Sequence, residues 1–325
     1  MSDLAATANS QAPTASRKAG GIVLAGLGLL LLITGPWFFY PGFLMKAMCF
    51  ALFASAYNLI FGFGGLLSFG HAAFFGGGAY VAGHAAKVWG FPPEFMLLTG
   101  AVVGMLLGAL FGVFAIRRQG IYLAMVTLAF AQMVYFLALR APFTGGEDGL
   151  QGIPRGHLFG LIDLNDMDTM YYFLATVFVL VVMLIVRIVN SPFGQALKAV
   201  RDNELRAASL GYDVNMVKLQ AFVLSAMLSG LAGAMKALVF QLVALSDVHW
   251  MMSGEVVLMT LLGGAGTLIG PIIGATAIVT MQNYLAGFGS WVMMIQGAIF
   301  VLCVLLLRGG IARGLASLWA LVRNR

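Results

Sequence analysis

Residues 170–189 read MYYFLATVFVLVVMLIVRIV, and Arg187 is the only charged residue among them. A helix of about 20 mostly apolar residues is long enough to cross the hydrocarbon core of a bilayer. This stretch therefore predicts a membrane-spanning helix.

The composition of the whole chain indicates one membrane domain. Of its 325 residues, 61% are hydrophobic and 9% are charged, whereas a soluble domain has about 45–50% apolar and about 25% charged residues. Cys49 and Cys303 lie in separate apolar runs, which favours two buried thiols over a disulfide or a metal site. The formal charge of +6 does not indicate nucleic-acid binding, because basic residues beside membrane spans usually determine topology.

The apolar runs predict an all-α polytopic membrane protein with about ten spans. We expect a polar cytoplasmic tail at 1–19, a membrane domain at 20–307 and a basic cytoplasmic tail at 308–325. The first helix should be uncleaved and anchored at the interface by the aromatic run Trp37 to Tyr40. The predicted spans are 20–40, 44–62, 71–88, 95–116, 120–139, 170–189, 218–243, 252–265, 269–287 and 290–307. The span 252–265 is short, so a broken or re-entrant segment is the alternative there.

The distribution of charge supports this number of spans. With the N-terminus inside, the basic residues on the outer side are Lys46, Lys87, Arg140, Arg155 and Lys236, and the other 13 of the 18 Lys and Arg lie on the cytoplasmic side. The predicted outer loop 140–169 is acidic. Because positive residues concentrate in cytoplasmic loops, we expect both termini in the cytoplasm.

Glycines crowd the predicted junction of the second and third spans, where residues 62–80 read GFGGLLSFGHAAFFGGGAY. Glycine permits tight turns and interrupted helices, and an interrupted helix can turn backbone groups toward a passing solute. Dense helix packing alone is the alternative. A lone histidine at a helix end is also more often a hydrogen-bonded structural residue than part of a pathway. The pathway candidates here are Gly64, Gly65, Ser68, Gly70 and His71.

A second glycine cluster occupies residues 263–274, which read GGAGTLIGPIIG. Pro271 removes a backbone donor and favours the start of a helix. Glycine-interrupted segments in both halves of a chain indicate a pathway between structural repeats, so we predict two pseudo-repeated halves, although the two segments do not align residue by residue. The pathway candidates here are Gly263, Gly264, Gly266 and Gly270.

The segment 191–213 reads SPFGQALKAVRDNELRAASLGYD and is too polar to cross a membrane. Between Pro192 and Gly211 it predicts a pair of short amphipathic helices. Their approximate apolar stripe consists of Leu197, Val200, Leu205, Ala208 and Leu210. Such helices can dock in a groove of a partner protein or lie on anionic lipid.

Three runs of the chain, from about residue 50 to 307, resemble the LivM-type permeases of branched-chain amino acid ABC transporters, in the LivH/LivM permease family. The runs are Tyr57 to Leu59 with Gly65 to Phe74, Gly194 to Gly233, and Leu262 to Pro271. The second run contains AVRDNE at 199–204 and AASLG at 207–211.

The resemblance implies a permease of the bacterial inner membrane. It implies four kinds of partner: a homologous LivH-type permease subunit, two cytoplasmic ATPase subunits, a periplasmic solute-binding protein and membrane lipid. ATP and Mg would be bound by the ATPase subunits, with no cofactor in this chain. The segment 191–217 would be the coupling loop that docks on an ATPase. The coupling candidates are Gly194, Arg201, Glu204, Ala207, Ala208 and Gly211.

The sequence lacks the motifs of an ATPase and of an ion-coupled carrier, which favours a permease subunit. The chain has no Gly-x-x-x-x-Gly-Lys-Ser/Thr run, so it has no phosphate loop for ATP hydrolysis. No Asp or Glu lies centrally in a predicted span, whereas ion-coupled carriers usually need buried ionisable groups; Lys236 and Glu255 should reach the interface by snorkelling. We expect a permease subunit for branched-chain amino acids, not an enzyme. Urea, short amides or other amino acids are alternative solutes, and an ion-coupled carrier or channel is the alternative class.

Overall fold

The computed structural model describes residues 26, 28, 30–160, 162–285, 287, 291–306, 310 and 311. The predicted tails 1–19 and 308–325 lie outside the described residues, apart from residues 310 and 311. Most of the first half of the predicted span 20–40 also lies outside them, but residues 30–38 of that span are helical. The aromatic run from Trp37 to Tyr40, predicted as an interfacial anchor, is exposed.

Helices make up most of the described chain, as the sequence predicts. They are α2 (Pro41–Asn58), α3 (His71–Val88), α4 (Pro93–Ala115), α5 (Ile121–Arg140), α6 (Met167–Asn190), α7 (Pro192–Asp202), α8 (Glu204–Ser209), α9 (Val214–Phe240), α10 (Trp250–Gly263), α11 (Gly270–Leu285) and α12 (Trp291–Leu306). Each helix that corresponds to a predicted span begins and ends within four residues of the prediction. The largest differences are four residues: α2 ends at Asn58 instead of residue 62, and α9 begins at Val214 instead of residue 218.

Short elements connect the helices. The π-helix η1 (Leu59–Phe63) continues α2, and single 3₁₀ turns lie at η2 (Pro142–Thr144), η3 (Gly146–Asp148) and η4 (Leu245–Asp247). The strands are β1 (Leu150–Gln151), β2 (His157–Leu158), β3 (Ile162–Asp163) and β4 (Leu242–Val243). They form two antiparallel pairs, β1 with β4 and β2 with β3. Two-residue strands have too little pattern to be predicted from sequence.

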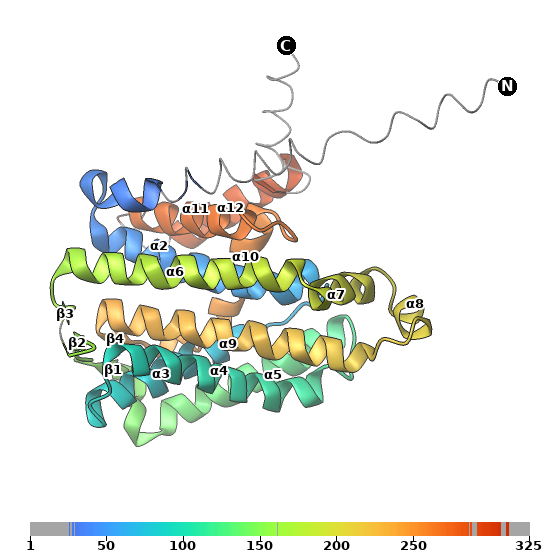
Figure 1. Cartoon of the computed structure of the whole chain (residues 1–325), viewed down its shortest axis with the longest axis horizontal. Helices are drawn as coiled ribbons and strands as arrows, with labels where there is room; N and C mark the ends of the chain where they lie inside the picture. Colours follow the sequence, from blue (N-terminus) through green and yellow to red (C-terminus); the bar gives the residue numbers. More distant parts are fainter. Residues whose placement is uncertain are drawn as a thin grey trace, which may run out of the picture.

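The long helices run side by side, and the short elements collect at their two ends (Figure 1). The strands gather at one end, which we call the strand end, and α7 and α8 lie at the other, which we call the α7 end. Helix α9 is central, because it packs against α2, α3 and α4. Glycines permit the close approach, since a Cβ on Gly104, Gly230 or Gly233 would overlap the backbone of a neighbouring helix.

Five described helical segments are long and apolar enough to cross a membrane by length and composition. They are Pro41–Phe63, Pro93–Ala115, Ile121–Arg140, Met167–Asn190 and Val214–Phe240. Helix α10 has 14 residues, so it rises about 21 Å, which is less than the roughly 30 Å hydrocarbon core.

Side-chain caps fix the boundaries of the polar segment between α6 and α9. Ser191 accepts a hydrogen bond from the Gly194 amide, with Pro192 as the first residue of α7. Asn203 and Asp213 accept in the same way from the Arg206 and Met216 amides. Such N-caps satisfy donors that a helix start leaves open. The prediction of two short helices between Pro192 and Gly211 is therefore confirmed, with Asn203 as the break between them.

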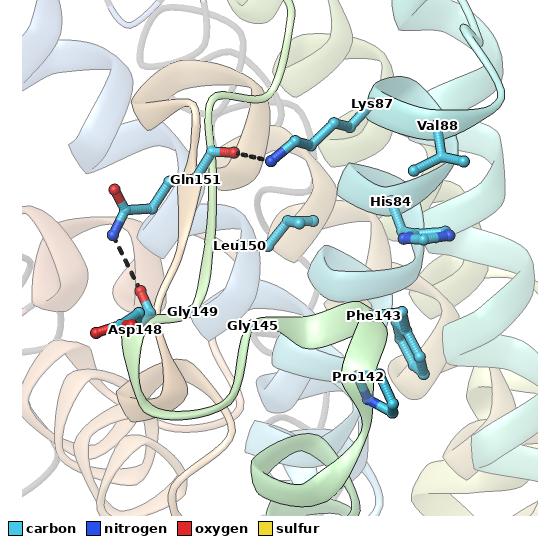
Figure 2. Close-up of a pocket in the computed structure, with 10 residues that line it drawn as sticks. All are labelled: His84, Lys87, Val88, Pro142, Phe143, Gly145, Asp148, Gly149, Leu150 and Gln151. Carbon is cyan, nitrogen blue, oxygen red and sulfur yellow. Dashed lines mark hydrogen bonds between the residues drawn. The ribbon is translucent and has the colours of Figure 1, made fainter.

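An open pocket of about 550 Å³ lies at the strand end, and the sequence did not predict it (Figure 2). It is bounded by the end of α3, with His84 and Lys87, and by the loop from Pro142 to Gln151. The Lys87 ammonium donates to the Gln151 carbonyl at 2.7 Å. The Gln151 amide in turn donates to the Asp148 carbonyl at 3.2 Å. The first contact attaches the loop to the end of α3, and the second lies within the loop.

Candidate functional site

Two glycine segments about 200 residues apart meet at the α7 end of the bundle. Helix α2 ends at Asn58 and continues as η1, a wider turn of the kind that often occurs at functional sites. Residues 64–70 are then non-helical up to the start of α3. In the other half, residues 264–269 form the non-helical connection between α10 and α11.

The Asn58 side chain holds the two glycine segments together. Its Nδ2 donates to the Thr267 carbonyl at 2.8 Å, and its Oδ1 accepts from the Gly266 amide at 2.9 Å. A Cβ on Gly62 would overlap both Asn58 Oδ1 and the Gly266 amide, so this contact requires glycine. One amide side chain thereby satisfies two backbone groups of a connection that has no regular partners of its own.

Arg201 of α7 joins this contact. Its Nη1 donates to the Gly62 carbonyl oxygen at 2.9 Å, and its Nε and Nη2 bond to Asp202 Oδ1 at 3.1 and 2.9 Å. A Cβ on Gly65 would lie 2.7 Å from Arg201 Cγ, so the glycine leaves room for the arginine stem. The predicted coupling and pathway residues are thus in direct contact at this point.

Helix α7 is packed firmly against the bundle. Leu197 and Val200 are fully buried, and Leu197 lies directly over Gly64. The Lys198 ammonium lies 5.6 Å from the centre of the Phe63 ring, within the range of a cation–π contact. Gly194 permits the turn from α6 into α7, because a Cβ there would overlap the Val189 carbonyl.

Helix α8 differs, because the approximate apolar stripe is divided between a buried part on α7 and an exposed part on α8. Leu205 and Leu210 are 85% and 70% exposed, and Ala208 is exposed, while Ala207 is buried. The cause is the extended backbone of Asn203, with φ −161° and ψ 105°, which interrupts the helix and reorients α8. Gly211 ends the segment at φ +89°, a conformation that favours glycine.

Glu204 connects α8 to the rest of the bundle. Its Oε1 lies 2.5 Å from the Lys218 ammonium, and its Oε2 accepts from Gln119 Nε2 at 2.7 Å. The Lys218 side chain is 2% exposed, so Glu204 supplies the countercharge that a buried ammonium needs. Sequence reasoning assigned no site role to Lys218, Gln119 or Asn58, although Asn58 and Lys218 lie within the runs that carry the family resemblance.

The remaining pathway candidates of the first segment are buried between helices. His71 Nε2 lies 2.8 Å from Ser225 Oγ, and its Nδ1 lies 3.2 Å from Ser68 Oγ. Ser225 Oγ donates to the Ala56 carbonyl at 2.6 Å, so it accepts from Nε2, and Nδ1 accepts from Ser68. The imidazole thereby joins α3, α9 and α2, and Gly70 lies against α5. A solute can contact these residues only in a conformation in which the helices separate.

The second glycine segment is tightly folded. A Cβ on Gly263 would overlap the Gly270 carbonyl, so α10 and α11 are in backbone contact where they meet. Between them Gly264 and Gly266 have φ values of +116° and +77°. A side chain would therefore overlap neighbouring atoms at Gly263 and Gly270 and strain the backbone at Gly264 and Gly266.

The prediction that Lys236 reaches the membrane interface by snorkelling is wrong, because its side chain is mostly buried. Its ammonium forms an ion pair with Asp247, whose side chain is 2% exposed and whose Oδ2 accepts from the Ala244 amide at 3.1 Å. Asp247 lies in η4, outside the predicted spans, so the hydropathy pattern did not place it beside α9. The ion pair therefore neutralises a mostly buried charge near the end of α9 that lies at the strand end.

Comparison with known proteins agrees with the resemblance. The model of a family described as "Branched-chain amino acid transport system / permease component" matches residues 40–304. The chain is 28% identical over 281 residues to the "High-affinity branched-chain amino acid transport system permease protein LivM" of Salmonella typhimurium, and equally to that of Escherichia coli. These matches cover 79% of this chain and 66% of each relative's length.

A third relative is the "Probable branched-chain amino acid transport permease protein LivM" of Methanocaldococcus jannaschii. It is 25% identical over 199 residues, which cover 57% of this chain and 54% of that protein. No solved structure gave a significant match. Since the family model covers most of the chain, including η1, α7, α8 and both glycine segments, the chain belongs to the family of permease components of branched-chain amino acid transport systems.

Proposed function

We propose that the chain is the membrane-spanning permease subunit of an ABC importer for branched-chain amino acids. The family membership and the activity that the Salmonella and Escherichia relatives' names describe support this assignment. The proposed assembly contains a LivH-type permease subunit, two cytoplasmic ATPase subunits that bind ATP and Mg, and a periplasmic solute-binding protein. The chain itself is a pore subunit and performs no chemical step.

The proposed topology places the strand end outside and the α7 end in the cytoplasm of a bacterium, with the spans in the inner membrane. Lys87, Arg155 and Lys236, which the charge distribution assigned to the outer side, all bond to groups at the strand end. Arg201 and Lys218 lie at the α7 end. The ten helical segments of the predicted spans then cross in alternation, with α10 as a short crossing that 264–269 completes. Both tails would be cytoplasmic, and the two glycine segments would mark two repeated halves.

The proposed coupling route begins at α8. Its exposed Leu205 and Leu210 supply an apolar surface for an ATPase, within the loop 191–217. Movement of α8 about Asn203 would reach α7, and from there Arg201 would change its contact with Gly62. Because Asn58 links the Gly62 region to residues 264–267, both glycine segments would respond together. The contact between Arg201 and Gly62 is the single observation that carries this proposal.

ATP binding and hydrolysis in the partner subunits would favour one arrangement of the helices over another. A ligand shifts such an equilibrium only through a difference in its affinity for the two states. We therefore propose that the two arrangements of the helices differ at the α7 end, where α7 and the glycine segments contact one another through few hydrogen bonds. A pathway bordered by Gly65 and Gly266 would open when these contacts change.

Uptake by proteoliposomes tests the proposal. The chain is reconstituted alone and, in parallel, with the second permease subunit, the ATPase subunits and the binding protein, and radiolabelled leucine is supplied outside. Accumulation should require the full set of subunits and ATP at the ATPase side. Accumulation by the chain alone, driven by a proton or sodium gradient, would contradict the proposal and establish an ion-coupled carrier.

A further inference from the structure

Helix α8 is attached to the bundle by few side chains. It lies at the tip of the α7 end, beside the start of α9 (Figure 1). Of its six residues only Ala207 is buried. In the part of the chain that the structure describes, Glu204 is the one residue of α8 whose side chain hydrogen-bonds to another helix or loop. A displacement of α8 therefore acts on the partners of Glu204 as well as on α7.

The partners of Glu204 belong to two other segments. Its Oε1 lies 2.5 Å from the ammonium of Lys218 in α9, and its Oε2 accepts from Gln119, between α4 and α5, at 2.7 Å. The Lys218 side chain is 2% exposed, so separation from this carboxylate would leave a buried charge without a partner, which is strongly unfavourable. When α8 moves, the ion pair should therefore stay joined and α9 should move with it.

Lys218 lies on a face of α9 that is packed into the bundle. Lys218, Phe222 and Ser225 are all buried, and their spacing of four and three residues places them on one side of the helix. Lys218 and Ser225 are about 10 Å apart along the helix axis. Ser225 Oγ donates to the Ala56 carbonyl at 2.6 Å and lies 2.8 Å from His71 Nε2. This face of α9 thus connects Glu204 to α2 and to the first residue of α3.

The first glycine segment is consequently held at both of its ends. At one end Arg201 of α7 donates to the Gly62 carbonyl at 2.9 Å, and at the other end His71 contacts Ser225 of α9. Residues 64–70 between these contacts are non-helical. Helices α7 and α8 follow one another directly at Asn203. Both ends of the glycine segment are therefore connected to the loop 191–217, through separate contacts.

We propose that the ion pair between Glu204 and Lys218 is a second coupling contact, through which a displacement of α8 reaches His71 by way of α9. Lys218 is then a positioning residue, because it acts on the glycine segment only through α9. The inference rests on the proposed function and deepens it. Arg201 acts on the Gly62 end of the segment, whereas Lys218 acts on the His71 end, and coupling requires both contacts.

The test is Lys218→Met in the complete importer, with leucine uptake and ATP hydrolysis measured in the same proteoliposomes. Methionine removes the ammonium and keeps a long, unbranched side chain in the buried position. Uptake per ATP hydrolysed should fall roughly tenfold, the effect of one lost hydrogen bond between charged groups, while basal ATP hydrolysis is retained. Lys87→Met is the control, because it removes the same charge from an exposed residue at the strand end, and it should leave uptake per ATP unchanged.

A second variant tests the other end of the route. Ser225→Ala removes the hydroxyl that contacts His71 and Ala56, and it should lower uptake per ATP roughly fivefold, because a hydrogen bond between neutral groups contributes less than one between charged groups. Ser229→Ala is its matched control. Ser229 is equally buried, but its hydroxyl donates to the Ser225 carbonyl within α9 at 2.8 Å, so uptake per ATP should not change. Ser225→Ala decides the question on its own if Lys218→Met does not assemble.

Uptake per ATP separates transmission from stability. A variant that is only less stable leaves fewer working importers, which lowers uptake and ATP hydrolysis in proportion and leaves their ratio unchanged. An unchanged ratio in Lys218→Met or in Ser225→Ala would therefore overturn the second contact and leave the proposed function intact. A ratio lowered equally in Ser229→Ala would also overturn it, since any lost hydroxyl in α9 would then have this effect. If the wild-type importer took up no leucine, the proposed function itself would fail, and the inference with it.

Discussion

Nη1 of Arg201, in α7, donates a hydrogen bond to the carbonyl oxygen of Gly62, in η1, at 2.9 Å. The two residues are 139 positions apart in the chain. Gly62 lies in the last turn of η1 (Leu59–Phe63), where backbone carbonyls have no partner within the helix. The polar segment that we assign to ATPase docking therefore contacts the backbone of the first glycine segment directly.

Gly65 and Gly211 should respond differently to substitution by alanine. Both have positive φ values, +70° and +89°, and a non-glycine residue there is disfavoured by about 1–2 kcal/mol. Gly211 faces open space, whereas a Cβ on Gly65 meets the Arg201 stem. Gly65→Ala should lower the melting temperature of the purified chain more than Gly211→Ala does. Equal effects would show that the contact with Arg201 is unimportant.

Asn58→Ala removes both hydrogen bonds that hold residues 266 and 267. The Gly266 amide and Thr267 carbonyl would lose their partners in a partly buried place, which destabilises the chain by about 1–3 kcal/mol. Asn58→Asp should be no better, because a carboxylate cannot donate to the Thr267 carbonyl. Thermal unfolding in detergent measures the effect, with the exposed Asn190→Ala as control. A melting temperature equal to that of the control would contradict the role assigned to Asn58.

Glu204 and Lys218 should be energetically coupled. Glu204→Gln leaves the buried Lys218 ammonium without a countercharge, and Lys218→Met leaves Glu204 half-exposed and able to reach water. The first change should therefore destabilise more than the second, by about 1–3 kcal/mol. The double variant should be more stable than the sum of the two single effects predicts. Strict additivity in this double-mutant cycle would mean that the pair contributes nothing to the attachment of α8.

Asp247→Asn should be among the most destabilising single changes at the strand end. It leaves the Lys236 ammonium mostly buried without its carboxylate, and breaking such a pair typically costs about 3–5 kcal/mol. The exposed Asp148→Asn is the matched control, and it should unfold like the wild type. If Asp247→Asn unfolds like the wild type too, Lys236 reaches water as snorkelling would require.

Much of the fold could be predicted because membrane helices carry a strong local signal. The segment 71–88 coincides with α3, and 290–307 differs from α12 by one residue at each end. Breaks in the apolar pattern, such as the glycines and Pro271, give these boundaries. The number of helices that cross the membrane remains a prediction, because α10 is short and the first span is described only in part.

Contacts between distant segments could not be predicted in the same way. Asn58 is one polar residue at the end of a long apolar run, and nothing local indicates that its amide faces Gly266. The sequence did not indicate that the approximate apolar stripe through 197–210 is divided, because a single extended residue, Asn203, changes the direction of the second helix. Asp247 was missed as the partner of Lys236 because it lies in a short turn between spans. The roles of the glycines in a pathway, and of α8 in docking, remain predictions.

The most direct test of the coupling route is Arg201→Ala in the complete importer, with leucine uptake and ATP hydrolysis measured in the same proteoliposomes. The exposed Arg206→Ala is the control on the same segment. The contact between Arg201 and Gly62 predicts that Arg201→Ala retains basal ATP hydrolysis while uptake per ATP falls roughly tenfold, the amount expected for one lost hydrogen bond from a charged group. Unchanged uptake per ATP in Arg201→Ala would contradict the account, because the coupling signal would then bypass this contact.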